Sequence, residues 1–329
     1  TASSLNCHLR CTKLHEYRYE LGYKSVESIT AFLVGSAVHI GLEAFWNGAT
    51  CRDARNQAIR FMDGEEFFKT DTGLVERAKV GAYIYGYYAR WESERHLYEV
   101  IQPELEFSFV GRMLKAPGYG HVLVNTAGKL DVLVRRKSDG QLIIIEHKTA
   151  SKSSKASEPG SPYWSKLGMD TQLCFYIDNI HALTGERPEV MYDVVIKSSA
   201  RLMKSKARKR KTETDAQFEQ RKAETDETLS AFRTRMVELY TEHHLEKGPY
   251  EPRFIRKMVH ITPNEVSVKM GELAYTMRSI ENKDLRIRNT SACSSYGSTC
   301  EFMDVCNGVA QLDDPRFEKK EVMNEELSV

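Results

Sequence analysis

Residues 128–149 read GKLDVLVRRKSDGQLIIIEHKT, with two apolar runs on either side of a Ser-Asp-Gly sequence at 138–140. Apolar runs that flank such a turn sequence predict a β-hairpin. Successive side chains of a strand point to opposite faces of the sheet. Glu146 and Lys148, near the end of the second run, should therefore share one face, and His147 should point to the other.

The turn decides where Asp131, in the first run, lies relative to these residues. A two-residue turn at 139–140 places Asp131 across from Lys148 and diagonal to Glu146. A turn at 138–139 places Asp131 opposite Glu146. Both registers put two carboxylates and one ammonium group on one face, whereas a three-residue loop would put Asp131 on the other face and exclude a shared site.

Two carboxylates at close range repel each other unless a positive charge lies between them. A hard divalent cation such as Mg²⁺ fits, because it prefers one or two carboxylates together with water and substrate phosphate. Lys148 beside the cation could steady a phosphate or orient a hydrolytic water. The same residues also fit an edge hairpin with an ordinary Asp–Lys cross-strand pair, since short D…ExK patterns are common.

The whole chain has 329 residues, of which 41% are hydrophobic and 28% charged, and its net charge is +1. This length fits one large domain or two small ones, and any basic surface must be local. No apolar run approaches the roughly 18 residues of a membrane span, and the first residues lack the apolar core of a signal peptide. We therefore expect an intracellular, reducing compartment, where the seven cysteines bind metal or are buried thiols.

Two predicted helices add candidate site residues. Residues 30–46 are strongly apolar with a helical period, and His39 lies among their small and apolar side chains. It is either a satisfied core residue or an imidazole that faces a metal at the mouth of the site. In a helix predicted over 163–183, Gln172 and Tyr176 are four residues apart and so lie on one face.

The other predicted elements alternate between helices and strands. On a strand predicted over 101–110, Glu104 and Glu106 share a face, either as further ligands or as its solvated side. A loop at 151–162 could touch a phosphate backbone or be a plain connector. Further elements are two helices within 53–98, strands over 192–197 and 251–259, and a helix over 262–280.

The segment 198–247 changes character. Residues 204–211, KSKARKRK, hold six basic residues in eight, and a Glu-, Lys- and Arg-rich amphipathic helix follows. A charge run of this kind is often only a solvated surface. Beside a phosphodiester-cutting site it could instead bind nucleic acid by neutralising phosphates. Sequence alone leaves both interpretations open.

Three cysteines, Cys293, Cys300 and Cys306, lie within fourteen residues of one another. In a reducing compartment this spacing indicates a metal site, although a tetrahedral four-cysteine set lacks one ligand. Cys7 and Cys11, four residues apart in a predicted N-terminal helix, have a spacing that suits metal binding or two packed small residues.

In their order and spacing these motifs resemble the RecB-type branch of the PD-(D/E)xK nucleases. In that branch a GxxxH motif lies on an early helix, matched here at 35–39, and a GxxD motif lies on a strand, matched at 128–131. The ExK strand is matched at 146–148 and the QxxxY helix at 172–176. The resemblance spans residues 11–306.

The cysteine pattern is similar to that of iron–sulfur members of this family, including AddB and CRISPR-associated nucleases, which have one cysteine before the nuclease core and three after it. Cys11, followed by the aromatic and basic run YRYELGY, matches the upstream cysteine better than Cys7. The YGxxCxFxDxC element at 296–306 resembles phage-encoded members. The resemblance thus implies a [4Fe–4S] cluster, with zinc as the alternative metal, on Cys11, Cys293, Cys300 and Cys306. Three cysteines would lie outside this set, namely Cys7, Cys51 and Cys174.

The resemblance implies an α/β fold with a mixed central sheet flanked by helices, as in restriction endonucleases. Residues 1–310 would form a single nuclease domain with a basic helical insertion at 198–247. The cysteines would join the two ends of this domain as a clasp. Residues 311–329 would be an acidic C-terminal tail.

The implied activity is metal-dependent hydrolysis of DNA phosphodiesters, exonucleolytic, in recombination, repair or replication. Lys148 would stabilise the transition state or orient the water, and Gln172 and Tyr176 would order the site or the nucleic-acid strand. The metal, Mg²⁺ or Mn²⁺, would be held by His39, Asp131 and Glu146.

Two departures from the family pattern stand out. The Cys-x6-Cys spacing is longer than the Cys-x2-Cys of several relatives, and the segment 198–247 has no counterpart. The motif GxxxxGK[ST] is missing from the sequence, so the chain should not be an ATP-driven helicase by itself.

The implied partners are DNA and a helicase or recombinase, in the cytoplasm of a bacterial or phage-infected cell. The alternatives are a catalytically inactive nuclease fold that binds nucleic acid or assembles complexes, and a zinc-stabilised DNA-binding protein.

Overall fold

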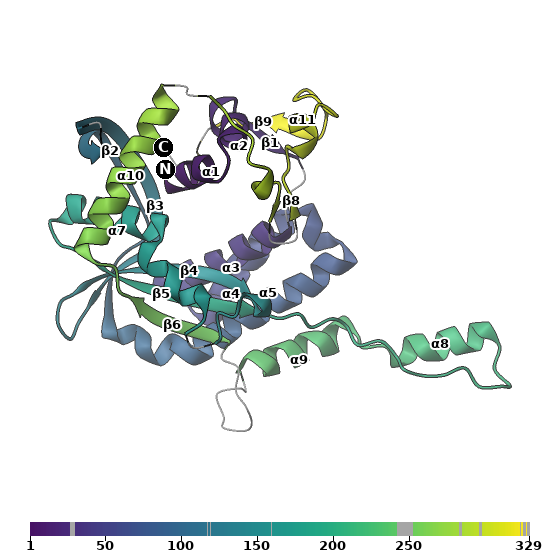
Figure 1. Cartoon of the computed structure of the whole chain (residues 1–329). Helices are drawn as coiled ribbons and strands as arrows, with labels where there is room; N and C mark the ends of the chain where they lie inside the picture. Colours follow the sequence, from purple (N-terminus) through teal and green to yellow (C-terminus); the bar gives the residue numbers. More distant parts are fainter. Residues whose placement is uncertain are drawn as a thin grey trace.

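The computed structural model describes residues 1–26, 30–116, 118, 120–158, 160–241, 253–282, 285–295, 298–322, 324 and 327. At its centre is a five-stranded sheet in the order β2-β3-β4-β5-β6 (Figure 1). β4 and β5 are parallel, and the other neighbouring strands are antiparallel. The strands are β2 Tyr98–Ala116, β3 Gly120–Arg136, β4 Leu142–Ser151, β5 Glu189–Lys197 and β6 Phe254–Val259.

The stretch 128–149 forms the predicted hairpin between β3 and β4. Arg135 pairs with Leu142, and the pairing continues to Val132 opposite Ile145. This is the register of a turn at 138–139, which brings Asp131 opposite Glu146. The apolar run of β4 is unbroken because this central strand is covered on both faces, where a strand needs no polar alternation.

Helices cover both faces of the sheet, which confirms the predicted α/β class (Figure 1). Ile144 of β4 belongs to the core under α7 and α10, whereas Ile143 and Ile145 belong to the core under α3, α4 and α5. The first layer consists of α1 Ala2–Arg10, α7 Thr171–Thr184 and α10 Pro263–Glu281. The second consists of α3 Thr30–Trp46, α4 Cys51–Gly64, α5 Asp71–Trp91 and α9 Leu229–Thr241.

Side-chain caps fix where several of these helices begin. The hydroxyl of Thr262 accepts a hydrogen bond from the Glu265 N–H at the start of α10, the helix predicted over 262–280. Asp170 caps α7 in the same way, so the helix predicted over 163–183 is divided. Short helical segments precede α7 at Pro162–Ser165 (α6) and Lys166–Met169 (η5), and others lie at Glu66–Lys69 (η2), Glu92–Leu97 (η3), Lys152–Ser154 (η4) and Thr290–Ala292 (η7).

The two ends of the chain meet beside the main sheet (Figure 1). Strand β1, Tyr23–Ser25, pairs antiparallel with β9, Phe317–Lys319, within the segment predicted as an acidic tail. Phe317 is buried and stacks on Phe302, so this part of the tail is packed. The remaining elements of this region are α2 Thr12–His15, the π-helix Glu16–Glu20, β7 Ser294–Ser295, β8 Ser298–Thr299 and α11 Met303–Cys306.

Between β5 and β6 the chain leaves the body of the molecule as an arm formed by residues 198–241 (Figure 1). The sequence predicted one amphipathic helix after the basic run, but the structure has two, α8 Asp215–Thr225 and α9. The end of the predicted insertion, 242–247, lies outside the described residues. No helix within the described ranges is long and apolar enough to cross a membrane.

Candidate active site

A pocket of about 810 Å³ collects all six residues that the sequence nominated for chemistry. They come from four elements, which bring together positions far apart in the chain. The six are His39 on α3, Asp131 on β3, Glu146 and Lys148 on β4, and Gln172 and Tyr176 on α7. The pocket therefore holds two carboxylates, an ammonium group and an imidazole.

Glu146 and Lys148 point to the same side of β4 and form an ion pair, as strand alternation predicted. The Glu146 side chain is 2% exposed, whereas that of Lys148 is 33% exposed. Burial raises the pKa of Glu146 to about 7, against the opposing effect of the Lys148 charge. Burial alone would lower the pKa of Lys148, but Glu146 and Asp131 raise it above its usual range. Lys148 is thus a cation at neutral pH.

Asp131 is held from two sides. Its Oδ2 accepts a hydrogen bond of 2.6 Å from the backbone N–H of His147, and its Oδ1 lies 3.4 Å from Nδ1 of His39. Burial would raise the pKa of Asp131, but His39, followed by His147 and Lys148, holds it well below its usual range. Asp131 is therefore an anion at neutral pH. His39 faces the pocket rather than being sealed in the helical core.

Gln172 and Tyr176 lie on one face of α7, and they fix the position of the lysine. The amide Nε2 of Gln172 donates to the hydroxyl of Tyr176 over 2.9 Å, and that hydroxyl donates to the backbone oxygen of Lys129 over 2.6 Å. Nζ of Lys148 donates to Oε1 of Gln172 over 3.4 Å. The tyrosine thus anchors the glutamine to β3, and the glutamine holds the ammonium group of Lys148.

The backbone is irregular where β2 passes the site. Glu104 has a φ of +49° and lies between two paired positions, so that it faces Asp131 across the strands. Leu130 contributes to one core and Val132 to the other, although residues two apart on a regular strand share a face. The irregularity therefore breaks the alternation at Asp131. A non-glycine residue in this left-handed conformation carries strain of roughly 1–3 kcal/mol.

Three other charged residues of the pocket were not singled out from the sequence, namely Glu43, Lys129 and Lys197. Glu43 lies one helical turn after His39 on α3. Its i+4 spacing from His39 was the available signal. Lys197, the last residue of β5, also lines the pocket. Nothing in its local sequence distinguishes it, because only the parallel pairing of β4 and β5, which sets Lys197 beside Ser151, brings it to the pocket.

On the opposite face of β4, His147 meets a buried polar cluster that the sequence did not reveal. Nδ1 of His147 lies 3.3 Å from Oδ2 of Asp193, which also accepts hydrogen bonds from Tyr87 and Arg256 at 2.6 and 3.0 Å. The guanidinium group of Arg256 lies 4.1 Å from the ring centre of Trp91. These residues come from four separate elements, α5, β4, β5 and β6, so no sequence spacing links them.

The cysteines predicted to join the chain ends lie in the region where the two ends meet. Cys11, Cys300 and Cys306 pack around a small core of aromatic and aliphatic side chains. Cys293 lies alongside, where its backbone oxygen accepts a 2.7 Å hydrogen bond from the N–H of Cys300. Burial raises the pKa of Cys306, and the neighbouring Cys11 and Cys293 add to the effect.

The three remaining cysteines differ in their surroundings. Cys7 belongs to the same small core and is buried. Cys174 is fully buried in α7, and Cys51 is the first residue of α4. Cys51 and Cys174 therefore lie outside the cysteine group at the chain ends.

Within the described ranges, no group of three or more His, Cys, Asp or Glu side chains is arranged to hold a metal ion. The donor sets nevertheless fit the expected groups by their chemistry. Asp131 and Glu146 supply hard carboxylate oxygens to one pocket, as Mg²⁺ requires. The four-cysteine set supplies thiols from both chain ends, as zinc or an iron–sulfur cluster requires.

Comparison with known proteins places this chain in a family. A family model described as the PD-(D/E)XK nuclease superfamily matches residues 1–307. No curated protein matches the chain. A solved structure from Eubacterium rectale, described as a "Putative exonuclease", is 15% identical, with a TM-score of 0.47, and the match covers 95% of this chain and 89% of that one. Since the family model covers nearly the whole chain, this protein belongs to the PD-(D/E)XK nuclease superfamily.

Proposed function

We propose that this protein is a metal-dependent nuclease of the RecB type that hydrolyses DNA phosphodiesters as an exonuclease, in recombination, repair or replication. The observation that carries the proposal is the meeting of Asp131, Glu146 and Lys148 in one open pocket. Lys148 and, when protonated, His39 are the cations beside these two carboxylates. A histidine that binds a metal must be neutral. One ammonium group then lies beside two carboxylates, and this excess of negative charge suits a bound cation.

The side chains of this pocket have distinct proposed roles. Lys148, held by Gln172, places a fixed positive charge where negative charge develops on the phosphoryl group, and such preorganised charge favours the transition state. Tyr176 keeps the glutamine in place. A Mg²⁺ or Mn²⁺ ion would polarise the phosphate and generate the attacking hydroxide. The residues that would hold it are His39, Asp131 and Glu146.

We also propose that residues 1–310 form one nuclease domain, closed by a [4Fe–4S] cluster, with zinc as the alternative. The support is the set of four thiols contributed by both ends of the chain, namely Cys11, Cys293, Cys300 and Cys306. Polar contacts already join these ends: the Thr12 hydroxyl accepts from and donates to the backbone of Ile287, at 2.7 and 3.0 Å. Metal binding at such a site couples to folding.

The experiment that tests the nuclease proposal uses end-labelled single- and double-stranded DNA. Purified protein should degrade labelled DNA when Mg²⁺ or Mn²⁺ is added and should stop when EDTA is added. A protein that binds DNA equally well with and without EDTA, and cuts no substrate with either metal, would instead be an inactive nuclease fold with a binding role.

A further inference from the structure

The arm, residues 198–241, has a packed base and a polar outer part. At the base, α9 buries Phe232, Met236 and Tyr240 in the core that also contains α5. In the outer part, none of the residues of α8 is buried. An apolar core therefore anchors the arm to the body, but such a core does not hold its outer half.

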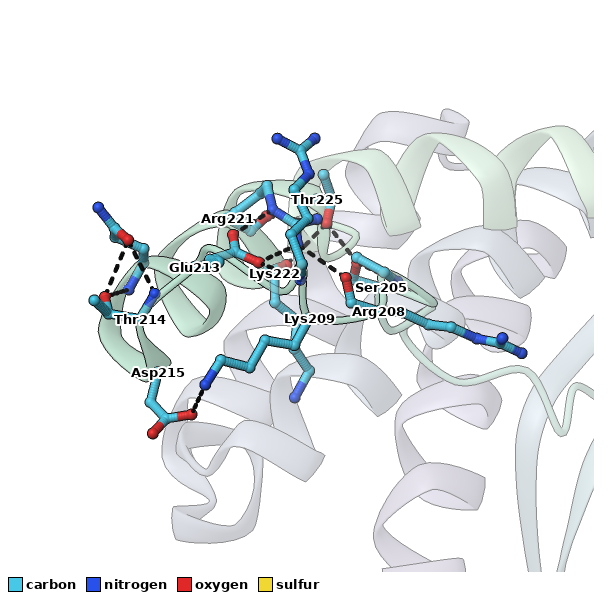
Figure 2. Close-up of polar contacts among 12 residues, drawn as sticks. Ser205, Arg208, Lys209, Glu213, Thr214, Asp215, Arg221, Lys222 and Thr225 are labelled. Atoms are coloured by element: carbon cyan, nitrogen blue, oxygen red, sulfur yellow. Dashed lines mark hydrogen bonds and ion pairs between the residues drawn. The ribbon is translucent and has the colours of Figure 1, made fainter.

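Polar contacts hold the outer half together, as Figure 2 shows. Arg221 forms two hydrogen bonds of 2.7 Å with Glu213, and Lys209 pairs with Asp215. The outgoing leg, 198–214, is thereby tied to α8 along its length. Further hydrogen bonds between the leg and the end of α8 join Ser205 to Thr225, Ser205 to Asp226, and Met203 to Glu227.

The charged side chains of the leg that these contacts do not pair are positive. Glu213, the acidic residue of the leg, is matched by Arg221, and Asp226 at the end of α8 is matched by Lys204. In the part of the chain that the structure describes, no carboxylate forms an ion pair with Lys206, Arg208 or Lys211, and all three are exposed. The leg therefore presents cations to solvent that its own fold does not use.

The leg begins directly at the candidate active site. Lys197 lines the catalytic pocket, and the arm starts at the next residue. A second hollow of about 870 Å³ follows between the base of the arm and the start of α5, and its charged lining is mixed, with Arg201 and Lys204 from the leg facing Asp71 and Glu76. The unpaired cations of the leg lie beyond this hollow along the chain, so they start a few residues after the pocket.

We infer that the arm binds the phosphate backbone of duplex DNA beyond the bond being cut, through Lys206, Arg208 and Lys211. This inference rests on the proposed nuclease function, because the active-site pocket fixes where the DNA begins. Phosphate contacts of this kind add affinity without sequence preference. The arm would therefore act as a duplex-length sensor, engaging only DNA long enough to reach it.

The composition of the arm favours a duplex backbone over unpaired bases. Binding of single strands relies on aromatic side chains that stack on bases. Between 198 and 228 the sequence has one aromatic residue, Phe218, whose ring is flanked by Arg221 and Lys222. The first fourteen residues of the leg, 198–211, would reach at most about 46 Å if fully extended. At about 3.4 Å per base pair this corresponds to roughly a dozen base pairs.

The test compares two triple variants of the full-length protein, both built on Glu146→Gln so that DNA is bound without being cut. One changes Lys206, Arg208 and Lys211 to Gln. The matched control makes the same change of charge with Gln at Arg52, Arg60 and Lys137, three exposed positions that do not line the pocket. Binding to duplexes of about 8 and about 30 base pairs is measured across salt concentrations.

Each lost phosphate contact lowers the salt slope of log K by about 0.9, so the arm variant should lose roughly 2–3 on the long duplex. On the short duplex, which cannot reach the arm, the arm variant and the control should have the same salt slope. An unchanged slope on the long duplex would overturn the inference. Equal loss on a long single strand would overturn the duplex preference.

The two proposals can fail separately. If the unmutated chain cuts no DNA but the arm variant still loses its salt slope, the nuclease proposal fails while the arm inference stands. If the unmutated chain cuts DNA and the arm variant, rebuilt with Glu146 intact, cuts long and short duplexes at the wild-type rate at elevated salt, the arm inference fails while the nuclease proposal stands.

Discussion

The backbone N–H of His147 donates a 2.6 Å hydrogen bond to Oδ2 of Asp131. The regular pairing of β3 with β4 ends at Val132 and Ile145, so this side-chain contact continues the connection between the strands where the ladder stops. It joins the Asp131 carboxylate to the strand that carries Glu146 and Lys148. The protein therefore positions the first carboxylate by its own backbone, independently of any bound ion.

We expect Asp131→Asn to abolish cleavage without unfolding the protein. The amide oxygen of Asn can still accept from the N–H of His147, but the charge that would bind a metal ion is lost. Activity should fall by at least roughly 100-fold, since even indirect supports of a metal site cost 10–100-fold. Initial rates on labelled DNA, with circular dichroism as the folding control, measure this. Wild-type rates in Asp131→Asn would exclude Asp131 from the mechanism.

The hairpin and its site could be predicted from the sequence because their residues are local or regularly spaced. Strand alternation fixed Glu146 and Lys148 on one face, and helical spacing placed Gln172 and Tyr176 together. The register of β3 stayed open between two turns, since the Ser-Asp-Gly sequence permits both. The backbone irregularity at Glu104 could not be predicted, because it arises from the meeting of strands β2 and β3.

The buried pair of Asp193 and Arg256 makes a prediction about stability. Arg256→Met removes the charge and leaves the fully buried Asp193 carboxylate without its partner. Breaking one side of a buried pair typically costs about 3–5 kcal/mol. Denaturant unfolding should show this loss. Arg135→Gln is the matched control, because Arg135 pairs with Glu186 in solvent, and it should change stability little. Comparable losses in both variants would contradict the role of burial.

The same pair predicts a pH dependence. Burial would raise the pKa of Asp193, but Arg256, with His147 and Tyr87, holds it below its usual range. The unfolded chain therefore binds the proton more readily, with a pKa of about 3.9. The stability that the carboxylate contributes is present above that pH and is lost as pH falls through the native pKa.

The comparison of wild type with Asp193→Asn isolates this effect. The difference in unfolding free energy between the two proteins should be constant between about pH 6 and 8. It should shrink below about pH 4, where Asp193 of the unfolded chain takes up a proton before Asp193 of the folded protein does. Denaturant titrations at each pH measure it. A difference that stays constant to the lowest pH at which both proteins fold would show that Asp193 is not ionised in the folded state.

Two glycines of α5 should respond to alanine in opposite ways. At Gly86 an added Cβ would lie 2.5 Å from the backbone oxygen of Tyr240 and 2.8 Å from the ring of Phe254. Gly86→Ala should therefore destabilise the protein by about 1–3 kcal/mol, the usual cost of overpacking. At Gly81 the nearest atom is the Arg55 side chain, 3.8 Å away. Gly81→Ala should stabilise the helix by up to about 1 kcal/mol. Equal effects in thermal unfolding would refute this account of how α5 meets α9.

The need for glycine at position 86 could not be predicted, because it depends on contact with α9, which is remote from α5 in the sequence. The polar cluster around Asp193 was equally hidden, because Tyr87, His147 and Arg256 are remote in the chain. Local pattern thus predicted the elements and most of the pocket. Contacts between elements remote in sequence decided the rest.

The last prediction concerns the four-cysteine set. Cys11→Ala should lower metal content and unfolding temperature together, because Cys11 is the one member from the N-terminal end and its loss frees that end from Cys293, Cys300 and Cys306. Cys7→Ala is the matched control: Cys7 lies in the same small core, so its truncation costs packing but should leave the metal bound. Anaerobically purified wild type should be brown, with broad absorption near roughly 400 nm. Colourless protein that contains stoichiometric zinc would show that zinc, and not an iron–sulfur cluster, is bound by the same four cysteines. If metal is retained in Cys11→Ala and lost in Cys7→Ala, the N-terminal ligand is Cys7 and not Cys11.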